Sequence, residues 1–166
     1  RLFMCSKIAA LTRWHDEGRT KDGLSRHPAD SAQWKYFDEL HEDFAKDSRH
    51  FRLGYGSDGF NPFRSNNVNY SVRTIILIPY NFPPWMCMKQ SNFFLTLLIP
   101  GKHAPGSDMD VYLEPLIDDM VDMFLHGVKM YDVSKEEFFN LKATILWTIH
   151  DFPGLGYTAG CTTSGE

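Results

Sequence analysis

Cysteine is scarce in this sequence, and the few cysteines form no recognisable pattern. The 166 residues include three, Cys5, Cys87 and Cys161. Their odd number, their wide spacing and the lack of any Cys-x-x-Cys or His-paired arrangement give no support to a disulfide framework or a zinc site. We therefore expect the protein to work in a reducing compartment.

Long apolar runs and a strong charge of one sign are also missing. The longest apolar runs, residues 75–78 and 93–99, are far shorter than the roughly 20 residues that a membrane helix needs. The start of the chain has neither the apolar core nor the cleavage site of a signal peptide. A net charge of −4 argues against a strongly basic protein that wraps nucleic acid. We expect no membrane partner.

The sequence does contain enough apolar material for a core. It is 43% hydrophobic and 14% aromatic, in a chain the size of one domain. Charge is uneven: the first 73 residues hold 12 Lys and Arg against 10 Asp and Glu, and the rest hold 5 against 11. The chain begins without Met and ends at Ser164-Gly165-Glu166, so we expect an excerpt of a longer protein.

The first part of the chain is predicted to be helical. Residues 1–14 favour one helix, and a second is predicted after Asp30 or Ser31, either of which can cap it. The aromatic side of that second helix is interpreted as core packing. We expect an N-terminal helical segment over residues 1–48 and a second unit over residues 49–166.

From residue 51 the pattern becomes that of strands. Residues 51–55 alternate, residues 73–79 are a β-branched and almost continuously apolar run, and residues 93–99 form a third apolar run. Prolines and glycines separate the runs, and the links are short. Three successive strands with short links predict an antiparallel meander.

The clearest helix follows these strands. Apolar residues recur there at helical spacing, namely Leu113, Leu116, Ile117, Met120, Val121 and Phe124. Pro115 is expected in the first turn of this helix and Gly127 at its end. Residues 134–137 read as the capping box of one more short helix, and residues 143–149 return to strand character.

Two aspartates stand at predicted strand ends. Asp58 lies in a Gly-Ser-Asp-Gly turn after the first strand, and Asp151 follows the last one. The order strand, strand, strand, helix, strand is the start of a ribonuclease H-like fold, in which the fourth strand pairs in parallel with the first. That pairing would make the two acids neighbours, where ligands of α/β sheets bind. Adjacent carboxylates repel, and a hard cation such as Mg²⁺ relieves the repulsion.

Other readings of these acids are less specific. An Asp in a turn is more often structural than catalytic, so neither residue means much alone. Three further acids, Asp118, Asp119 and Asp122, fit a solvated helix face, and Asp108 with Asp110 fits a loop and helix cap. His150 is adjacent to Asp151, but adjacent side chains on a strand point to opposite faces, which favours a structural role.

Several blocks of residues resemble one protein family. They include Arg26-His27-Pro28-Ala29-Asp30 with Trp34, Arg52-Leu53-Gly54, Ser57-Asp58-Gly59-Phe60-Asn61-Pro62-Phe63, Pro83-Pro84-Trp85-Met86-Cys87-Met88-Lys89, Leu98-Ile99-Pro100-Gly101, Asp110-Val111-Tyr112-Leu113, and Leu146-Trp147-Thr148-Ile149 with Asp151-Phe152-Pro153. Together these blocks resemble the transposase of plant CACTA-type (En/Spm) DNA transposons. They cover nearly the whole chain, so the resemblance is specific.

The resemblance implies a DDE-type transposase with an RNase H-like catalytic core, incomplete at its C-terminus in this chain. Its acids would hold Mg²⁺ or Mn²⁺ for nicking at transposon ends and for transfer of the freed 3′-hydroxyl to target DNA. Asp58 matches the first acid and Asp151 the second, while Asp110 lies in another motif of the family; the topology favours Asp151. DNA partners, self-association of the full-length protein and a nuclear location are implied as well.

The departures from the family pattern shape the functional expectation. Members usually continue into a Cys-x-x-Cys segment and a third acid, a glutamate, which Glu166 does not match by spacing. His150 stands where Asn is expected, and Gly154 where Ala is common. We therefore expect two of three metal-binding acids and no activity from this piece alone. The alternatives are a catalytically dead or domesticated remnant that binds DNA or protein, and an unrelated ribonuclease or resolvase of the same fold.

Overall fold

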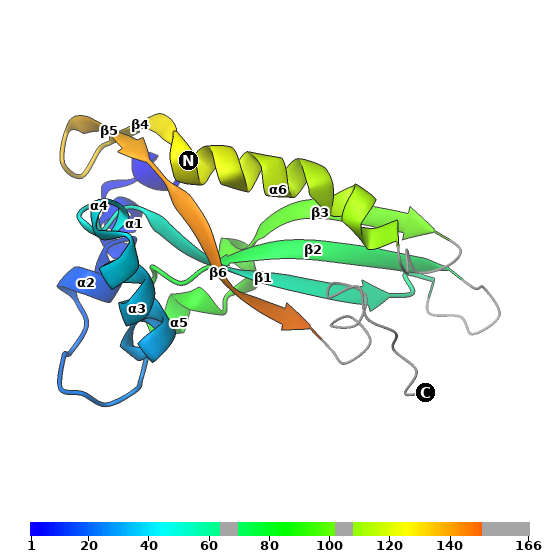
Figure 1. The fold of residues 1–166 in the computed structure, drawn as a ribbon, viewed down its shortest axis with the longest axis horizontal. Coiled ribbons are helices and arrows are strands. Elements are labelled where there is room, and N and C mark those ends of the chain that lie inside the picture. Colours follow the sequence, from blue (N-terminus) through cyan, green and yellow to red (C-terminus); the bar gives the residue numbers. More distant parts are fainter. Residues whose placement is uncertain (64–69, 102–107, 151–166) are drawn as a thin grey trace.

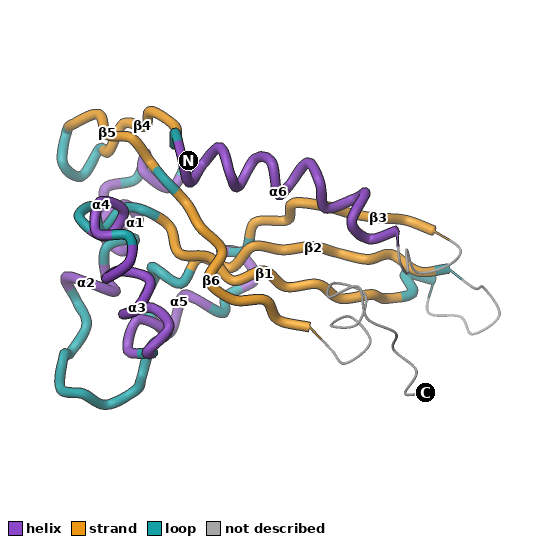
Figure 2. Tube along the Cα trace, viewed as in Figure 1, coloured by secondary structure: helices purple, strands orange, loops and turns teal. Residues whose placement is uncertain are grey.

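The computed structural model describes residues 1–63, 70–101 and 108–150. It has a mixed α/β fold in which a four-stranded sheet carries one long helix, with short helices gathered at one end of the sheet (Figures 1 and 2). The short helices come from the N-terminal part of the chain: η1 (Leu2–Met4), α1 (Ser6–Leu11), α2 (Trp14–Glu17), η2 (Pro28–Asp30), α3 (Ala32–Leu40) and α4 (Glu42–Ala45).

The sheet has the strand order β3-β2-β1-β6. Its strands are β1 (Phe51–Phe60), β2 (Ser71–Pro79), β3 (Phe94–Gly101) and β6 (Ala143–His150). β2 is antiparallel to β1 and to β3, which confirms the predicted meander, with α5 (Pro84–Cys87) and η3 (Gln90–Asn92) between β2 and β3. β6 is parallel to β1, as the predicted crossover requires.

The long helix α6 (Met109–Leu125) lies over one face of the sheet (Figure 1). It begins at Met109, more than one turn before Pro115, so Pro115 lies inside the helix and not in its first turn. Gly127 ends it as predicted: its φ is 67°, and its N–H donates to the carbonyl of Asp122. A side chain at position 127 would be strained by that φ and would meet the carbonyl of Leu141.

The prediction of a short helix with its capping box at residues 134–137 is wrong. The chain forms a hairpin there, with β4 (Val128–Asp132) antiparallel to β5 (Glu137–Leu141). Asp132 is fully buried, and its carboxylate accepts hydrogen bonds from the N–H and the hydroxyl of Ser134. Ser134 therefore serves a turn and is not a helix cap. The buried positions Phe139 and Leu141 follow the two-residue period of a strand.

The predicted first helix, residues 1–14, is broken into the short helices η1 and α1, and α2 begins at its last residue. Cys5 is extended between η1 and α1, because Phe3 is drawn into the core, where its ring lies 4.9 Å from that of Phe139. The carbonyl of Phe3 accepts from the N–H of Val133, which ties the N-terminus to the hairpin. In the next helix, Ser31 is the cap: its hydroxyl accepts from the N–H of Trp34 at 3.2 Å.

Two apolar clusters hold the described parts together. One joins Phe3 to the sheet face under α6, and the other joins Trp34 to Ile78, Tyr80 and Phe82. Both clusters combine residues from before and after position 48. None of the described helices is long and apolar enough to cross a membrane.

Candidate active site

Asp58 lies within the central strand β1. The sequence predicted a turn there, but β2 continues far enough to pair Asp58 with Thr74 and Phe60 with Val72. The first seven residues of β1 are buried and the last three, Asp58 among them, are exposed. The hydroxyl of Thr74 donates to the backbone carbonyl of Asp58 at 3.2 Å. The carboxylate is thus mounted on a paired strand and is open to solvent.

The two faces of β1 differ at this end. Tyr55 contributes to the face under α6, whereas Gly56 and Asp58 line a groove that also contains Ile76 and Ile78. Ser57 is buried, and its hydroxyl accepts from the guanidinium of Arg73 at 3.2 Å. The alternation of strand side chains therefore places the Asp58 side chain away from the long helix.

The neighbouring strand β6 approaches the same edge of the sheet. Its last residue, His150, is the register partner of Ser57, and its ring centroid lies 5.2 Å from that of Tyr55. Parallel strands present their carboxyl ends at one edge, where α/β sheets bind ligands. Asp151, the second predicted acid, is the next residue in the sequence and lies outside the described residues.

Asp58 has the chemical properties of a metal ligand without forming a complete site. Within the described ranges its carboxylate has no ion pair and no side-chain hydrogen bond, and no group of three acidic, His or Cys side chains there could hold a metal. Its oxygens suit a hard divalent cation, which takes several oxygen ligands. A second carboxylate is needed for a divalent ion to be held well.

The rival acids lie elsewhere. Asp118, Asp119 and Asp122 are exposed on α6, as the sequence predicted. Asp108 is the N-cap residue of α6, although its side chain makes no capping hydrogen bond, and Asp110 is exposed in the first turn. These five residues match the solvated helix face and cap that were expected of them.

A β-bulge in β1, four residues before Asp58, was not evident from the sequence. The β1–β6 register slips between Leu53 and Gly54, so that Leu53 pairs with Ile145 and Gly54 with Trp147. Gly54 is required there, because a Cβ would lie 2.6 Å from the ring of Tyr80. Bulges often adjust side-chain direction near active sites. The glycine in Arg52-Leu53-Gly54 was the available signal.

Sequence reasoning also missed a buried cation behind the strand. Arg52 is 1% exposed; its Nε donates to Asp38 at 3.0 Å, and its guanidinium carbon lies 4.8 Å from the centre of a Trp34 ring. The backbone N–H of Arg52 donates to the side-chain oxygen of the fully buried Asn81. These contacts fix the start of β1, the strand whose exposed end carries Asp58.

Both cysteines in the described part of the chain are free. Burial raises the pKa of Cys87 to about 12, so its thiol stays protonated, and it donates to the carbonyl of Phe82. A protonated thiol is a poor nucleophile and a poor metal ligand. Cys87 is therefore neither a nucleophile nor a metal ligand in this structure.

Comparison with known proteins matches most of the chain to a family model. The family model described as "Transposase family tnp2" matches residues 22–166. The match covers Asp58, Asp151 and every strand of the sheet. Searches of curated proteins and of solved structures found no match.

Proposed function

The chain belongs to transposase family tnp2, the En/Spm CACTA-type transposases, and from this we propose that it is part of a catalytic domain that cuts and joins DNA with Mg²⁺ or Mn²⁺. The observation that carries the proposal is the parallel pairing of Ser57 with His150. It aligns the residues that precede the two candidate acids, Asp58 and Asp151.

The strand order supports a ribonuclease H-like arrangement. Three antiparallel strands, a crossing helix and a fourth strand parallel to the first occur in the order that this fold requires. The β4–β5 hairpin is an addition between helix and fourth strand, and it lies at the end of the sheet with the short helices (Figure 1). It therefore does not obstruct the edge that carries Asp58.

We assign metal binding to Asp58 and Asp151. Two carboxylates on neighbouring strand ends repel when both are ionised, and a shared divalent cation removes that cost. A divalent ion held by these acids would lower the pKa of bound water and stabilise charge on a phosphate oxygen. The protein holds the backbone of Asp58 rigidly. It is paired with β2, and its carbonyl accepts a hydrogen bond from the hydroxyl of Thr74.

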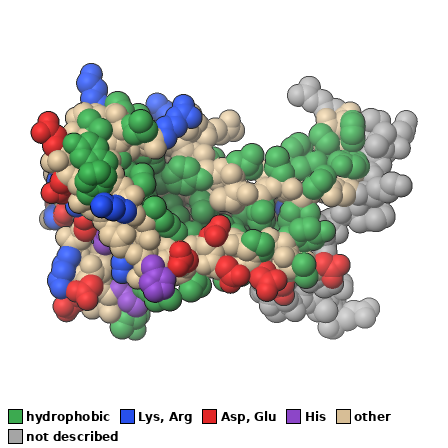
Figure 3. All heavy atoms as spheres, turned by 90° about the horizontal axis from the view of Figure 1, so that it is seen from above, with side chains coloured by type: hydrophobic (Ala, Val, Ile, Leu, Met, Phe, Trp, Pro, Cys, Tyr) green, Lys and Arg blue, Asp and Glu red, His purple; other side chains and the backbone are tan. Residues whose placement is uncertain are grey.

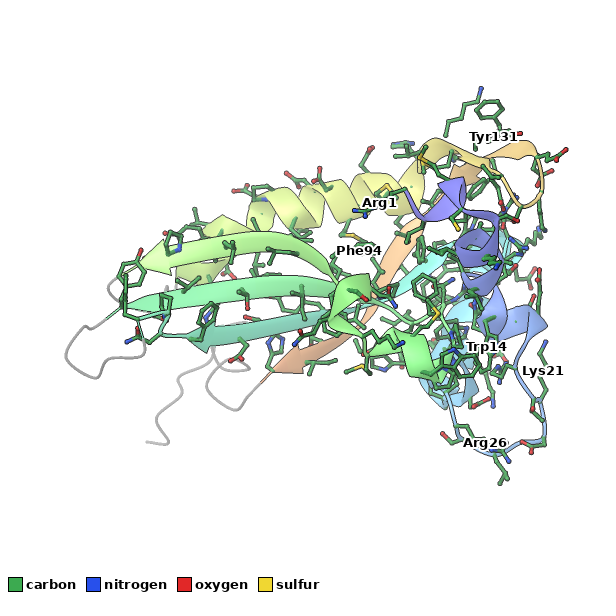
Figure 4. The ribbon with its side chains drawn as sticks, turned by 180° about the vertical axis from the view of Figure 1, so that it is seen from behind. Arg1, Trp14, Lys21, Arg26, Phe94 and Tyr131 are labelled. Carbon is green, nitrogen blue, oxygen red and sulfur yellow. The ribbon has the colours of Figure 1, made fainter. Side chains whose placement is uncertain are left out.

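DNA is the proposed substrate, as transposon ends and as target, with self-association and nuclear location proposed for the full-length protein. The basic residues before position 73 are only partly available for phosphate contacts. Arg13, Arg49 and Arg52 are buried and form ion pairs with acidic residues of the protein itself. Lys21 and Arg26 are exposed on a loop beyond the short helices (Figure 4), and each is paired with an aspartate. Contacts to DNA are therefore expected to come largely from basic residues other than these five.

Paramagnetic broadening of amide NMR signals by Mn²⁺ tests the metal role, because it also detects weak sites. We expect Gly59 and Thr74 to broaden at low Mn²⁺ and to stay sharp in Asp58→Asn. Asp118→Asn on the exposed face of α6 is the matched control and should behave like the parent chain. Equal broadening in the parent and in Asp58→Asn would remove Asp58 from the metal site.

A non-catalytic binding role is the second candidate, and one surface favours it. An apolar groove of about 430 Å³ lies between α6 and the sheet, with Ile117, Val121 and Leu125 exposed along it. Figure 3 shows hydrophobic side chains over much of this face, beside a row of acidic ones. Exposed apolar surface of this kind marks interaction sites. DNA or protein binding that is indifferent to Mn²⁺ and to Asp58→Asn would favour this role.

A further inference from the structure

A second groove begins at Asp58 itself. It has a volume of about 440 Å³ and lies on the sheet face opposite α6. Its floor includes Gly56, Thr74 and Ile76, and its wall is formed by Met88 and Phe93, from the segment between β2 and β3. The volume lies in the range of small-ligand pockets, which combine apolar walls with a few polar groups at one side.

The lining of this groove indicates what can enter it. None of the described residues that line it is Lys or Arg, and His150 is the residue among them that can carry a positive charge, so a phosphate group would find little positive charge there. The surface away from Asp58 is mainly aliphatic and aromatic. A nucleobase has flat apolar faces and suits such a surface, whereas the backbone of a duplex does not.

Hydrogen bonds within the protein hold the wall of the groove in place before any ligand binds. The side chain of Asn92 donates to the carbonyl of Met86 at 2.9 Å, and the thiol of Cys87 donates to the carbonyl of Phe82. Phe93 follows directly and is half-buried, so its ring is held while one part stays open. On the floor, a Cβ at Gly56 would lie 3.1 Å from Ile76, so the glycine keeps the groove deep.

We propose that this groove binds one unstacked nucleobase, that of the nucleotide beside the scissile phosphate. The inference rests on the proposed function, which places that phosphate at Asp58. Because consecutive nucleotides are linked, a phosphate at one end of the groove brings the neighbouring base into it. Enzymes that act on DNA commonly hold an extruded base between apolar or aromatic side chains. Phe93 is the stacking residue, and Met88 closes the rim.

A DNA duplex with a single unpaired 2-aminopurine tests the inference in Ca²⁺, which avoids turnover. We expect this DNA to bind about tenfold more tightly than the fully paired duplex, with a change in 2-aminopurine fluorescence. Phe93→Ala should abolish the preference. Phe138→Ala is the matched control, because that ring is 65% exposed on the distant hairpin and should leave the preference intact.

A second variant, Met88→Glu, tests the inference independently in case Phe93→Ala does not fold. Met88 is 63% exposed, so Met88→Glu leaves the core untouched while placing a negative charge on the rim. It should also abolish the preference for the unpaired base. Equal binding of paired and unpaired DNA, or a preference that survives both variants, would overturn the inference.

The base measurement and the Mn²⁺ measurement separate the two proposals. Mn²⁺ broadening should depend on Asp58 and be unaffected by Met88→Glu. If Asp58 governs Mn²⁺ but no base preference is found, only the base-binding inference fails. If the base preference depends on Phe93 but Asp58→Asn leaves Mn²⁺ broadening unchanged, the groove binds a base and the metal role fails.

Discussion

The two ends of strand β1 differ in burial and in packing. At the start, Phe51 to Ser57 are buried, and Arg52 is enclosed by Asp38, Trp34 and the helices of the N-terminal segment. At the far end Asp58 is exposed beside an open groove. One strand thus joins a tightly packed support to an accessible carboxylate, so changes at the start should cost stability and changes at the end should cost binding.

The N-terminal segment packs against the buried end of the sheet and stabilises it. Asp132 of the hairpin is fully buried and receives the guanidinium of Arg13 at 3.3 Å and that of Arg49 at 3.6 Å. Figure 4 shows Trp14 beside α5, where its ring lies 5.6 Å from that of Trp85. The segment thus contacts both the hairpin and the β2–β3 connection, and braces the sheet from behind.

The largest effect is expected from Asp38→Ala at the buried ion pair. It would leave the Arg52 guanidinium buried without its carboxylate, which costs about 3 kcal/mol of unfolding free energy. Urea denaturation measures this loss. Asp118→Ala, on the exposed face of α6, is the control and should unfold like the parent; a parent-like Asp38→Ala would contradict the supporting role of the pair.

Gly54→Ala is expected to have the next largest effect. The new methyl group would lie within 3 Å of the Tyr80 ring at the bulge, and such overpacking costs about 2 kcal/mol. Gly59→Ala is the matched control on the same strand, because a Cβ there would approach no atom closer than 3.4 Å, the distance to the end of the Arg73 side chain. Equal unfolding midpoints for the two variants would show that the bulge is not tightly packed.

A smaller effect, dependent on pH, is expected from His15. Burial, and then the nearby charge of Arg52, lower the pKa of His15 from 6.5 to about 3. As pH falls below 6.5, the unfolded chain takes up a proton that the folded one does not, so stability falls; between pH 6.5 and 5.5 the loss is about 1 kcal/mol. His15→Gln should remove this part of the pH dependence, measured by urea denaturation at each pH. An unchanged slope would contradict the burial of a neutral His15.

The smallest effect on stability is expected at the open end. Asp58→Asn removes no ion pair within the described ranges and keeps the shape of the side chain, so the unfolding midpoint should stay at the parent value. The same variant should abolish Mn²⁺ broadening at Gly59 and Thr74. A clear loss of stability in Asp58→Asn would mean that the acid supports the fold and is not held free for a ligand.

Patterns local in sequence predicted much of the fold. The apolar runs gave β1, β2, β3 and β6, and the helical period gave α6, because each element buries one face over many residues. The antiparallel meander followed from the short links, and the parallel fourth strand followed from the order of strands and helix, which matches the start of a ribonuclease H-like fold. Prediction from the sequence was least successful where a few polar atoms decide the local structure.

The parts that were missed depend on long-range contacts. Ser134 resembled a helix cap, but the buried Asp132, held by Arg13 and Arg49 from distant segments, makes it part of a hairpin turn. The bulge at Gly54 depends on the Tyr80 ring. Asp58 lies in a strand because β2 extends to pair with it. None of these partners can be identified from neighbouring residues.

For the site, the sequence predicted Asp58 and Asp151 at the ends of two neighbouring parallel strands. The structure places Asp58 on the exposed end of β1 and pairs Ser57 with His150. Asp151 stays a prediction, and so does the bound metal. The groove with Phe93 and Met88 could not be foreseen, because its lining comes from four separate segments of the chain.

Calorimetric titration of Mn²⁺ into four proteins tests the central claim most directly: the parent, Asp58→Asn, Asp151→Asn and the double variant. If both acids hold one ion, each single change should weaken binding nearly as much as the double change, because a shared site acts as a unit. Additive losses, or Mn²⁺ affinity unchanged in the double variant, would contradict a metal site made by Asp58 and Asp151.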